Sequence, residues 1–268
     1  MKKFIFASAV IIAAAMTSCS NDEPAAAPAG DGNVTFTAGI PALASRAFAD
    51  GTKATTLNYY VYDAEAAGGT VTPLITGTET FANLQATVNL NLVTGKTYDI
   101  VFWAPNEGAP YTYDPATQSV TVDYTADAAA NNESRDAFFC SVTGLKVDAP
   151  VNRSITLNRP FAQVNIGTSD IEDARKGGFD LSTTAFAVTL PNTLNLIDGT
   201  VSGSEDVSFT AAALPAEDFT VEPAKYDYIA MNYILVPADK QVVDMVLTAN
   251  DAAGQSRQVS LTPGPVQR

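Results

Sequence analysis

The chain has no histidine and only two cysteines among its 268 residues. Without histidine it has no Ser-His-Asp triad, and it lacks the usual general base and metal ligand near neutral pH. Two cysteines are too few for a cysteine-based zinc site, and neither a calcium-loop spacing nor a glycine-rich phosphate loop occurs. The sequence therefore predicts no metal site and no cofactor.

Basic residues are also scarce, with 15 Lys and Arg against 29 Asp and Glu, which gives a formal net charge of −14. A strongly acidic surface repels phosphate groups, so we expect no nucleic-acid partner. Carboxylates such as Asp99, Glu107, Asp114 and Asp123 could form a glycosidase pair, but any acidic protein offers such pairs. We interpret them as solvated surface charges and expect no catalytic residue and no enzyme activity.

A long apolar run occurs at the N-terminus, over residues 4–15, directly after two lysines. This is the pattern of a signal peptide, and the run is too short to span a bilayer. Small residues then precede Cys19, as they do where a lipoprotein signal peptidase cuts and leaves an acylated cysteine. We predict a lipoprotein signal peptide over residues 1–18 and lipidation at Cys19. An ordinary secretory signal with an incidental cysteine is the alternative.

The next residues, 19–32, are rich in alanine, proline and glycine, a composition with little to bury. They are predicted to form a flexible tether. Beyond them strand patterns recur, whereas helical periodicity is almost absent. Residues 84–92 alternate apolar and polar side chains, and the mostly apolar residues 97–104 predict a central strand. Further strand patterns occur at residues 34–40, 57–62, 119–124, 137–142, 153–157, 161–166, 184–190, 193–197, 207–210, 226–236, 242–249 and 256–261.

One short helix is predicted, because Ser169 and Glu172 have capping-box spacing and Gly177-Gly178 follows at a suitable distance for a C-cap. Pro160, within Asn158-Arg159-Pro160, should interrupt the strand pattern. The sequence thus predicts an all-β protein of two tandem β-sandwich domains, residues 33–157 and 158–268. The polar residues 131–135 are expected to form an exposed loop.

Aromatic residues cluster around Trp103, with Tyr111 and Tyr113 nearby in the sequence. An exposed tryptophan with loop tyrosines could stack on a sugar ring, so these three residues are candidate ligand contacts. The alternative is that both faces of the central strand are covered and that Trp103 belongs to the core or a domain interface. We favour this second interpretation.

Several segments, taken in order, resemble the fimbrillin-like lipoproteins of Bacteroidia, the subunits of type V pili. They are the signal and cysteine, Ala44-Ser45-Arg46, and residues 59–63, 98–104 and 158–166, which read YYVYD, YDIVFWA and NRPFAQVNI. The resemblance implies two transthyretin-like Greek-key sandwiches on a protein anchored by lipid in the outer membrane and exposed at the cell surface. It implies a fimbrial subunit with a structural and adhesive role. The alternative is a surface glycan-binding lipoprotein of a carbohydrate uptake system.

The same resemblance implies cutting by an arginine-specific protease between Arg46 and Ala47. In such proteins the first strand is then replaced by a strand of a neighbouring subunit. Here that strand would fill its groove with Val34, Phe36, Ala38 and Ile40. Other fimbrial subunits are thus the expected partners, and a receptor on a host or bacterial surface is a further one. Alternatively, Arg46 is a plain loop residue and the strand is permanent.

Similar proteins continue into further strands beyond the region where this sequence stops. We therefore expect the C-terminal domain to be incomplete, or the subunit to accept a strand without donating one.

Overall fold

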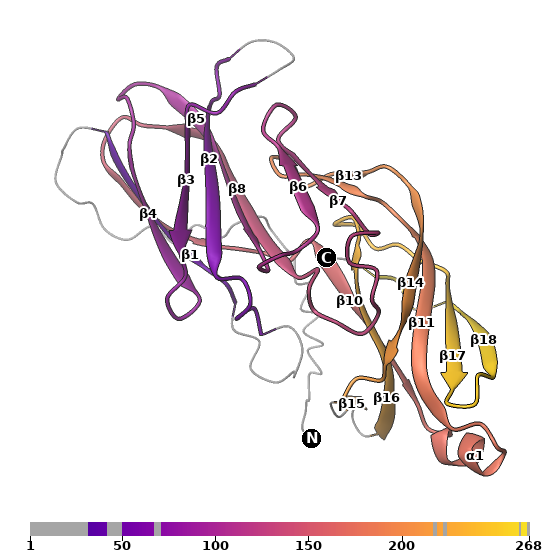
Figure 1. The fold of residues 1–268 in the computed structure, drawn as a ribbon. Helices are drawn as coiled ribbons and strands as arrows, with labels where there is room; N and C mark the ends of the chain where they lie inside the picture. The colour runs from indigo at the N-terminus through magenta and orange to yellow at the C-terminus, as the bar shows by residue number, and fades with distance from the viewer. Residues whose placement is uncertain are drawn as a thin grey trace, which may run out of the picture.

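The computed structural model describes residues 32–41, 50–66, 71–216, 219–221, 224–262 and 264–266. Over these residues the protein consists of β-strands and one short helix, which confirms the all-β class. The strands form two sandwiches that follow one another along an elongated molecule (Figure 1). The predicted signal peptide, residues 19–31 of the predicted tether (Cys19 among them), Arg46 and Ala47 lie outside the described residues.

The N-terminal sandwich packs a three-stranded sheet against a four-stranded one. The first has the order β4-β1-β9 and comprises β1 (Asn33–Gly39), β4 (Gln85–Asn91) and β9 (Val151–Thr156). The second has the order β3-β2-β5-β8 and comprises β2 (Thr56–Asp63), β3 (Ile75–Thr80), β5 (Thr97–Pro105) and β8 (Ala137–Lys146). Alternating side chains of both sheets fill one hydrophobic core between them.

Strand β5 is buried on both faces, as its apolar run predicts. Ile100 and Phe102 point into the N-terminal core, whereas Val101 and Trp103 belong to a second hydrophobic cluster on the other side of the sheet. That second cluster exists because another sheet packs against the outer side of β2 and β5.

This covering sheet has the order β13-β12-β7-β6 and draws on both halves of the chain. It comprises β6 (Tyr111–Asp114), β7 (Ser119–Val122), β12 (Thr193–Asn195) and β13 (Val201–Ser202). Leu194 of β12 lies opposite Val120 of β7 in the antiparallel register. The domain boundary after residue 157 stays a prediction, but one sheet is shared by strands from both sides of it.

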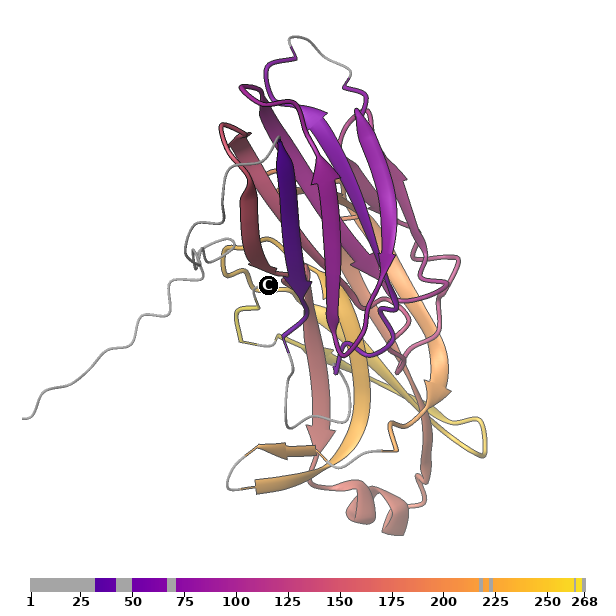
Figure 2. The same cartoon turned by 90° about the vertical axis from the view of Figure 1, so that its left-hand side faces the viewer.

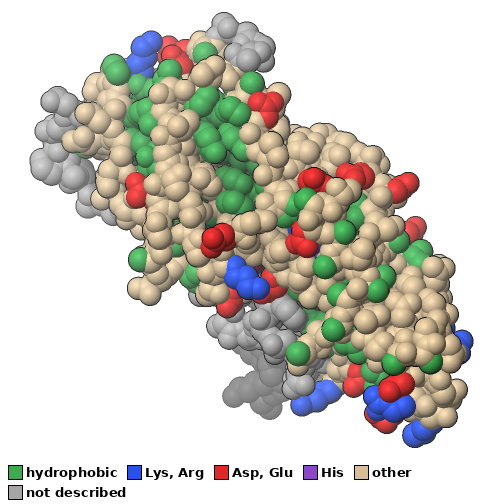
Figure 3. Space-filling view, in the orientation of Figure 1, with side chains coloured by type: hydrophobic (Ala, Val, Ile, Leu, Met, Phe, Trp, Pro, Cys, Tyr) green, Lys and Arg blue, Asp and Glu red, His purple; other side chains and the backbone are tan. Residues whose placement is uncertain are grey.

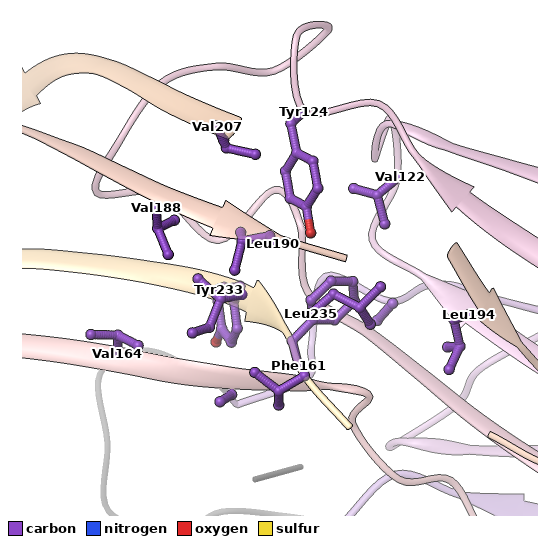
Figure 4. Close-up of a cluster of buried hydrophobic side chains, with 14 of the residues drawn as sticks. Val122, Tyr124, Phe161, Val164, Val188, Leu190, Leu194, Val207, Tyr233 and Leu235 are labelled. Carbon is purple, nitrogen blue, oxygen red and sulfur yellow. The ribbon is translucent and has the colours of Figure 1, made fainter. Parts of the chain in front are cut away.

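The C-terminal sandwich packs the sheet β10-β16-β15 against the sheet β14-β11-β17-β18. Its strands are β10 (Phe161–Thr168), β11 (Leu181–Leu190), β14 (Glu205–Ala213), β15 (Phe219–Val221), β16 (Ala224–Leu235), β17 (Met245–Asp251) and β18 (Ser256–Leu261). Val122 and Tyr124 from the first half enter the same cluster as Leu190 and Leu235 (Figure 4). The second core is therefore continuous with the junction between the halves.

The short helix α1 (Ile171–Lys176) is confirmed, and it ends at Gly177 as the sequence indicates, but its N-cap differs from the predicted capping box. Asp170 is the N-cap residue and makes no side-chain capping hydrogen bond, since its carboxylate accepts one from Thr168 instead. At the other end Gly177 is the C-cap residue, and Gly178 after it has a positive φ of 87°. Charged side chains gather at this end of the molecule on the face seen in Figure 3, where Arg175 pairs with Glu172 and Asp180.

Candidate functional site

The first strand, β1, is the middle strand of its sheet. It runs antiparallel to β4 from Asn33 opposite Asn91 to Gly39 opposite Gln85, and parallel to β9. Figure 2 shows β1 in indigo between these two neighbours. Removing β1 would therefore leave two unpaired strand edges, with hydrogen-bonding groups on both sides of an open groove.

The inner face of β1 is fully used by the core. Val34, Phe36 and Ala38 have no exposed surface, and Ile40, just beyond the strand, is 5% exposed. The ring of Phe36 meets that of Phe102 edge-on, with the centroids 5.1 Å apart. The structure thus brings together the four side chains that the sequence places on one face. Fully burying a Val, Ile or Phe contributes about 1.5–3 kcal/mol each, so this groove cannot stay empty without a large loss.

Glycines close the groove at both of its ends. Gly32 has a φ of 57°, and a Cβ there would lie 1.9 Å from the backbone oxygen of Leu92. Gly51 has a φ of 74°, and a Cβ there would lie 2.7 Å from Cγ2 of Ile40. Only glycine allows the chain to pass so close to the two ends of the buried segment.

The aromatic cluster is placed at the junction between the sandwiches. Trp103 is 3% exposed, and its ring meets that of Tyr111 edge-on with the centroids 5.3 Å apart. The hydroxyl oxygens of Tyr113 and Tyr62 lie 2.5 Å apart. The ring of Tyr113 packs against that of Tyr60, with the centroids 4.2 Å apart. Trp103 therefore has the core position that we favoured, and no open face of its indole is available for stacking on a sugar.

Burial also determines the acidity of these phenols. It raises the pKa of Tyr111 well above its ordinary value of 10.0, and it raises the pKa of Tyr113 in the same direction. Both groups stay neutral in the folded protein and act as hydrogen-bonding parts of an apolar interface.

The expectation of an exposed loop at residues 131–135 is wrong for Arg135, which is completely buried. Its Nη1 donates to the carbonyl of Asp127 at 2.5 Å and its Nη2 to that of Ala129 at 3.2 Å, while the guanidinium lies 4.5 Å from the centroid of Phe209. The polar sequence around Arg135 gives no sign of this, because two of its acceptors are backbone carbonyls and its contacts with Asn232 and Phe209 lie in the other half of the chain. Arg135 is a structural residue that joins the halves.

Within the described ranges, no group of three or more Asp, Glu, Cys or His side chains is arranged to hold a metal ion. No helix in that same part of the chain is both long and apolar enough to cross a membrane.

The family comparison covers nearly the whole chain. A family model described as "Family of unknown function (DUF6562)" matches residues 26–268. The chain belongs to this DUF6562 family. No curated protein matches it.

Several solved structures share the fold of this DUF6562 protein. One, named as a candidate adhesin from Bacteroides thetaiotaomicron, has 16% identity and a TM-score of 0.53, with 87% of this chain and 81% of that chain covered. Another, a candidate adhesin from Bacteroides ovatus, has 12% identity and a TM-score of 0.51, with coverage of 85% and 75%. A third is named for candidate polysaccharide-binding proteins (DUF1812) from Bacteroides thetaiotaomicron, with 16% identity, a TM-score of 0.50, and coverage of 83% and 78%. At such identities the likeness establishes a common fold.

Proposed function

We propose that this protein is a surface-exposed, lipid-anchored structural and adhesive protein of the fimbrial-subunit type. Two of the proteins that share its fold are named as candidate adhesins, which supports an adhesive role. The small residues before Cys19, after a short apolar run, support a lipid anchor. The proposal assigns no catalytic step to the chain, and its partners are other subunits and a surface receptor.

The observation that carries the proposal is the position of β1. It is an inner strand with a fully buried face, yet it is also the first strand of the described chain. A single cut after β1 would release it together with the peptide that precedes it, whereas an inner strand farther along the chain would need two cuts. Arg46 lies between β1 and Gly51, where such a cut would act.

The physical effect of the cut is a change in effective concentration. While β1 is covalently attached, it occupies the groove at a local concentration that no neighbour can match. After the cut β1 can leave, and an apolar strand of another subunit can enter by β-addition. Head-to-tail exchange of this kind is heterologous and gives an open fibre.

The test is digestion of the full chain with an arginine-specific protease, followed by sequencing of the new N-terminus and light scattering with a strand-donating subunit present. We expect a new N-terminus at Ala47 and larger assemblies. The Arg46→Lys variant is the matched control, because it keeps the charge but should resist this protease. A chain that is not cut at Arg46, or that is cut and stays monomeric with the donor present, would overturn the proposal.

A further inference from the structure

We infer that the groove under β1 selects its incoming strand by the order of side-chain sizes. The inference rests on the proposed strand exchange. The partner is an extended strand of another subunit with an aliphatic, an aromatic, a small and an aliphatic side chain at alternate positions. In β1 and the residue after it, Val34, Phe36, Ala38 and Ile40 occupy these four positions.

The second position requires an aromatic ring. Phe36 lies opposite Val88 of β4, and its ring makes an edge-on contact with Phe102 on the facing sheet. Edge-to-face aromatic pairs stabilise beyond the area that they bury. A small side chain here would leave a cavity beneath the middle of the strand, which the surrounding core fills only in part.

The third position requires a small side chain. Ala38 has no exposed surface, and its two neighbours across the sheet, Ala86 and Ile155, are each 3% exposed. Ala38 lies directly opposite Ala86, and both alanines belong to the closed core between the two sheets. Since protein interiors are close-packed, a phenylalanine at this position has no space to occupy without moving the two sheets apart.

The outer positions are aliphatic. Val34 lies opposite Leu90 of β4 and opposite Val151 of β9. Ile40 packs against Gly51, at a position where a Cβ would collide with it. By contrast Thr35 and Thr37 point to the other face and are partly exposed. Substitutions at these two positions should hardly affect the entry of the strand into the groove, and they therefore supply matched controls.

The experiment uses the full chain with a site-specific protease sequence inserted between Ser45 and Arg46, cut after folding. Fluorescent peptides with the sequence of residues 33–40 are incubated with the cut protein, and the bound peptide is measured after gel filtration. The test peptides carry Ala38→Phe or Phe36→Ala. The controls carry Thr37→Phe or Thr37→Ala, which make a similar change on the outer face.

We expect the unchanged and control peptides to bind, and each test peptide to bind at least about tenfold less than its control. If the Ala38→Phe and Phe36→Ala peptides bind as well as their controls, the size rule is overturned while strand exchange stands. If even the unchanged peptide does not enter the cut protein, the proposed exchange fails and the size rule fails with it.

Discussion

Arg159 holds Asp136 through two parallel hydrogen bonds, Nε to Oδ1 at 2.5 Å and Nη2 to Oδ2 at 2.8 Å. The Asp136 side chain is 3% exposed and that of Arg159 is 15% exposed, and the guanidinium also lies 4.6 Å from the centroid of Phe138. Burial raises the pKa of the Asp136 carboxyl, although the hydrogen bonds from Arg159 act in the opposite direction. The pair fastens the segment after β9 to the residue that precedes β8.

Removing one partner of this pair should destabilise the protein strongly. In the Asp136→Asn variant the guanidinium of Arg159 stays largely buried but loses its main counter-charge, which typically costs about 3–5 kcal/mol. Urea unfolding followed by circular dichroism measures the loss. The matched control is Asp148→Asn, because Asp148 pairs with Lys146 at 2.9 Å at the surface, with both side chains 61% exposed. Equal losses in the two variants would contradict the structural role of the Arg159 pair.

A comparison of alanine variants at Gly51 and Gly95 distinguishes the stability cost of backbone strain from that of crowding at the groove. Both have positive φ, 74° and 83°, so replacement by alanine carries a similar backbone cost. At Gly51 the new Cβ would also collide with Ile40, whereas no atom lies within 4 Å at Gly95. We expect Gly51→Ala to destabilise by about 1–3 kcal/mol more than Gly95→Ala, measured by thermal unfolding. If the two variants unfold at the same temperature, Ile40 does not pack tightly against Gly51.

Alkaline pH should destabilise the junction between the sandwiches. Burial raises the pKa of Tyr111, Tyr113, Tyr124 and Tyr233 above the ordinary value of 10.0. As pH rises past about 10, the unfolded chain loses these phenolic protons while the folded chain keeps them, so the free energy of unfolding falls. Urea midpoints between pH 8 and 11 measure the effect, which Tyr113→Phe should reduce. A midpoint that stays constant up to pH 11 would contradict it.

The single tryptophan offers a direct probe of the same junction. Because Trp103 is 3% exposed and packs against Tyr111, its fluorescence should be weakly quenched by acrylamide in the native protein and strongly quenched in urea. Added mono- and oligosaccharides should leave the native emission unchanged. Strong quenching of the native protein, or a saturable change with a sugar, would show that the indole is accessible.

Lipidation at Cys19 is tested by fractionation of cells that produce the full chain. The Cys19→Ala variant removes the thiol proposed to carry the lipid, so we expect it to move from the membrane fraction to the soluble fraction. Ser18→Ala is the control, since it keeps a small residue before the cysteine. Membrane retention of the Cys19→Ala variant equal to that of the unchanged chain would contradict the anchor.

Local pattern predicts much of this fold, because half-buried strands impose a period of two on the sequence. The alternation at residues 84–92 gives β4, with Ala86, Val88 and Leu90 buried, and the apolar run at residues 97–104 gives the doubly covered β5. The pairing of β7 with β12 has no such local signal, since it depends on the approach of segments about seventy residues apart. For the same reason, the sequence places Val34, Phe36 and Ala38 correctly but gives no warning that Arg135 is buried.

The two registers of β1 also determine how the sheet would carry a mechanical load. Hydrogen bonds of a sheet run roughly across the strands, and β1 has them along both edges, to β4 on one side and to β9 on the other. A force along the strand axis therefore shears both rows together instead of opening them one bond at a time. Whichever strand fills this position, a tensile pull along it meets the collective resistance of two ladders and of the buried side chains beneath them.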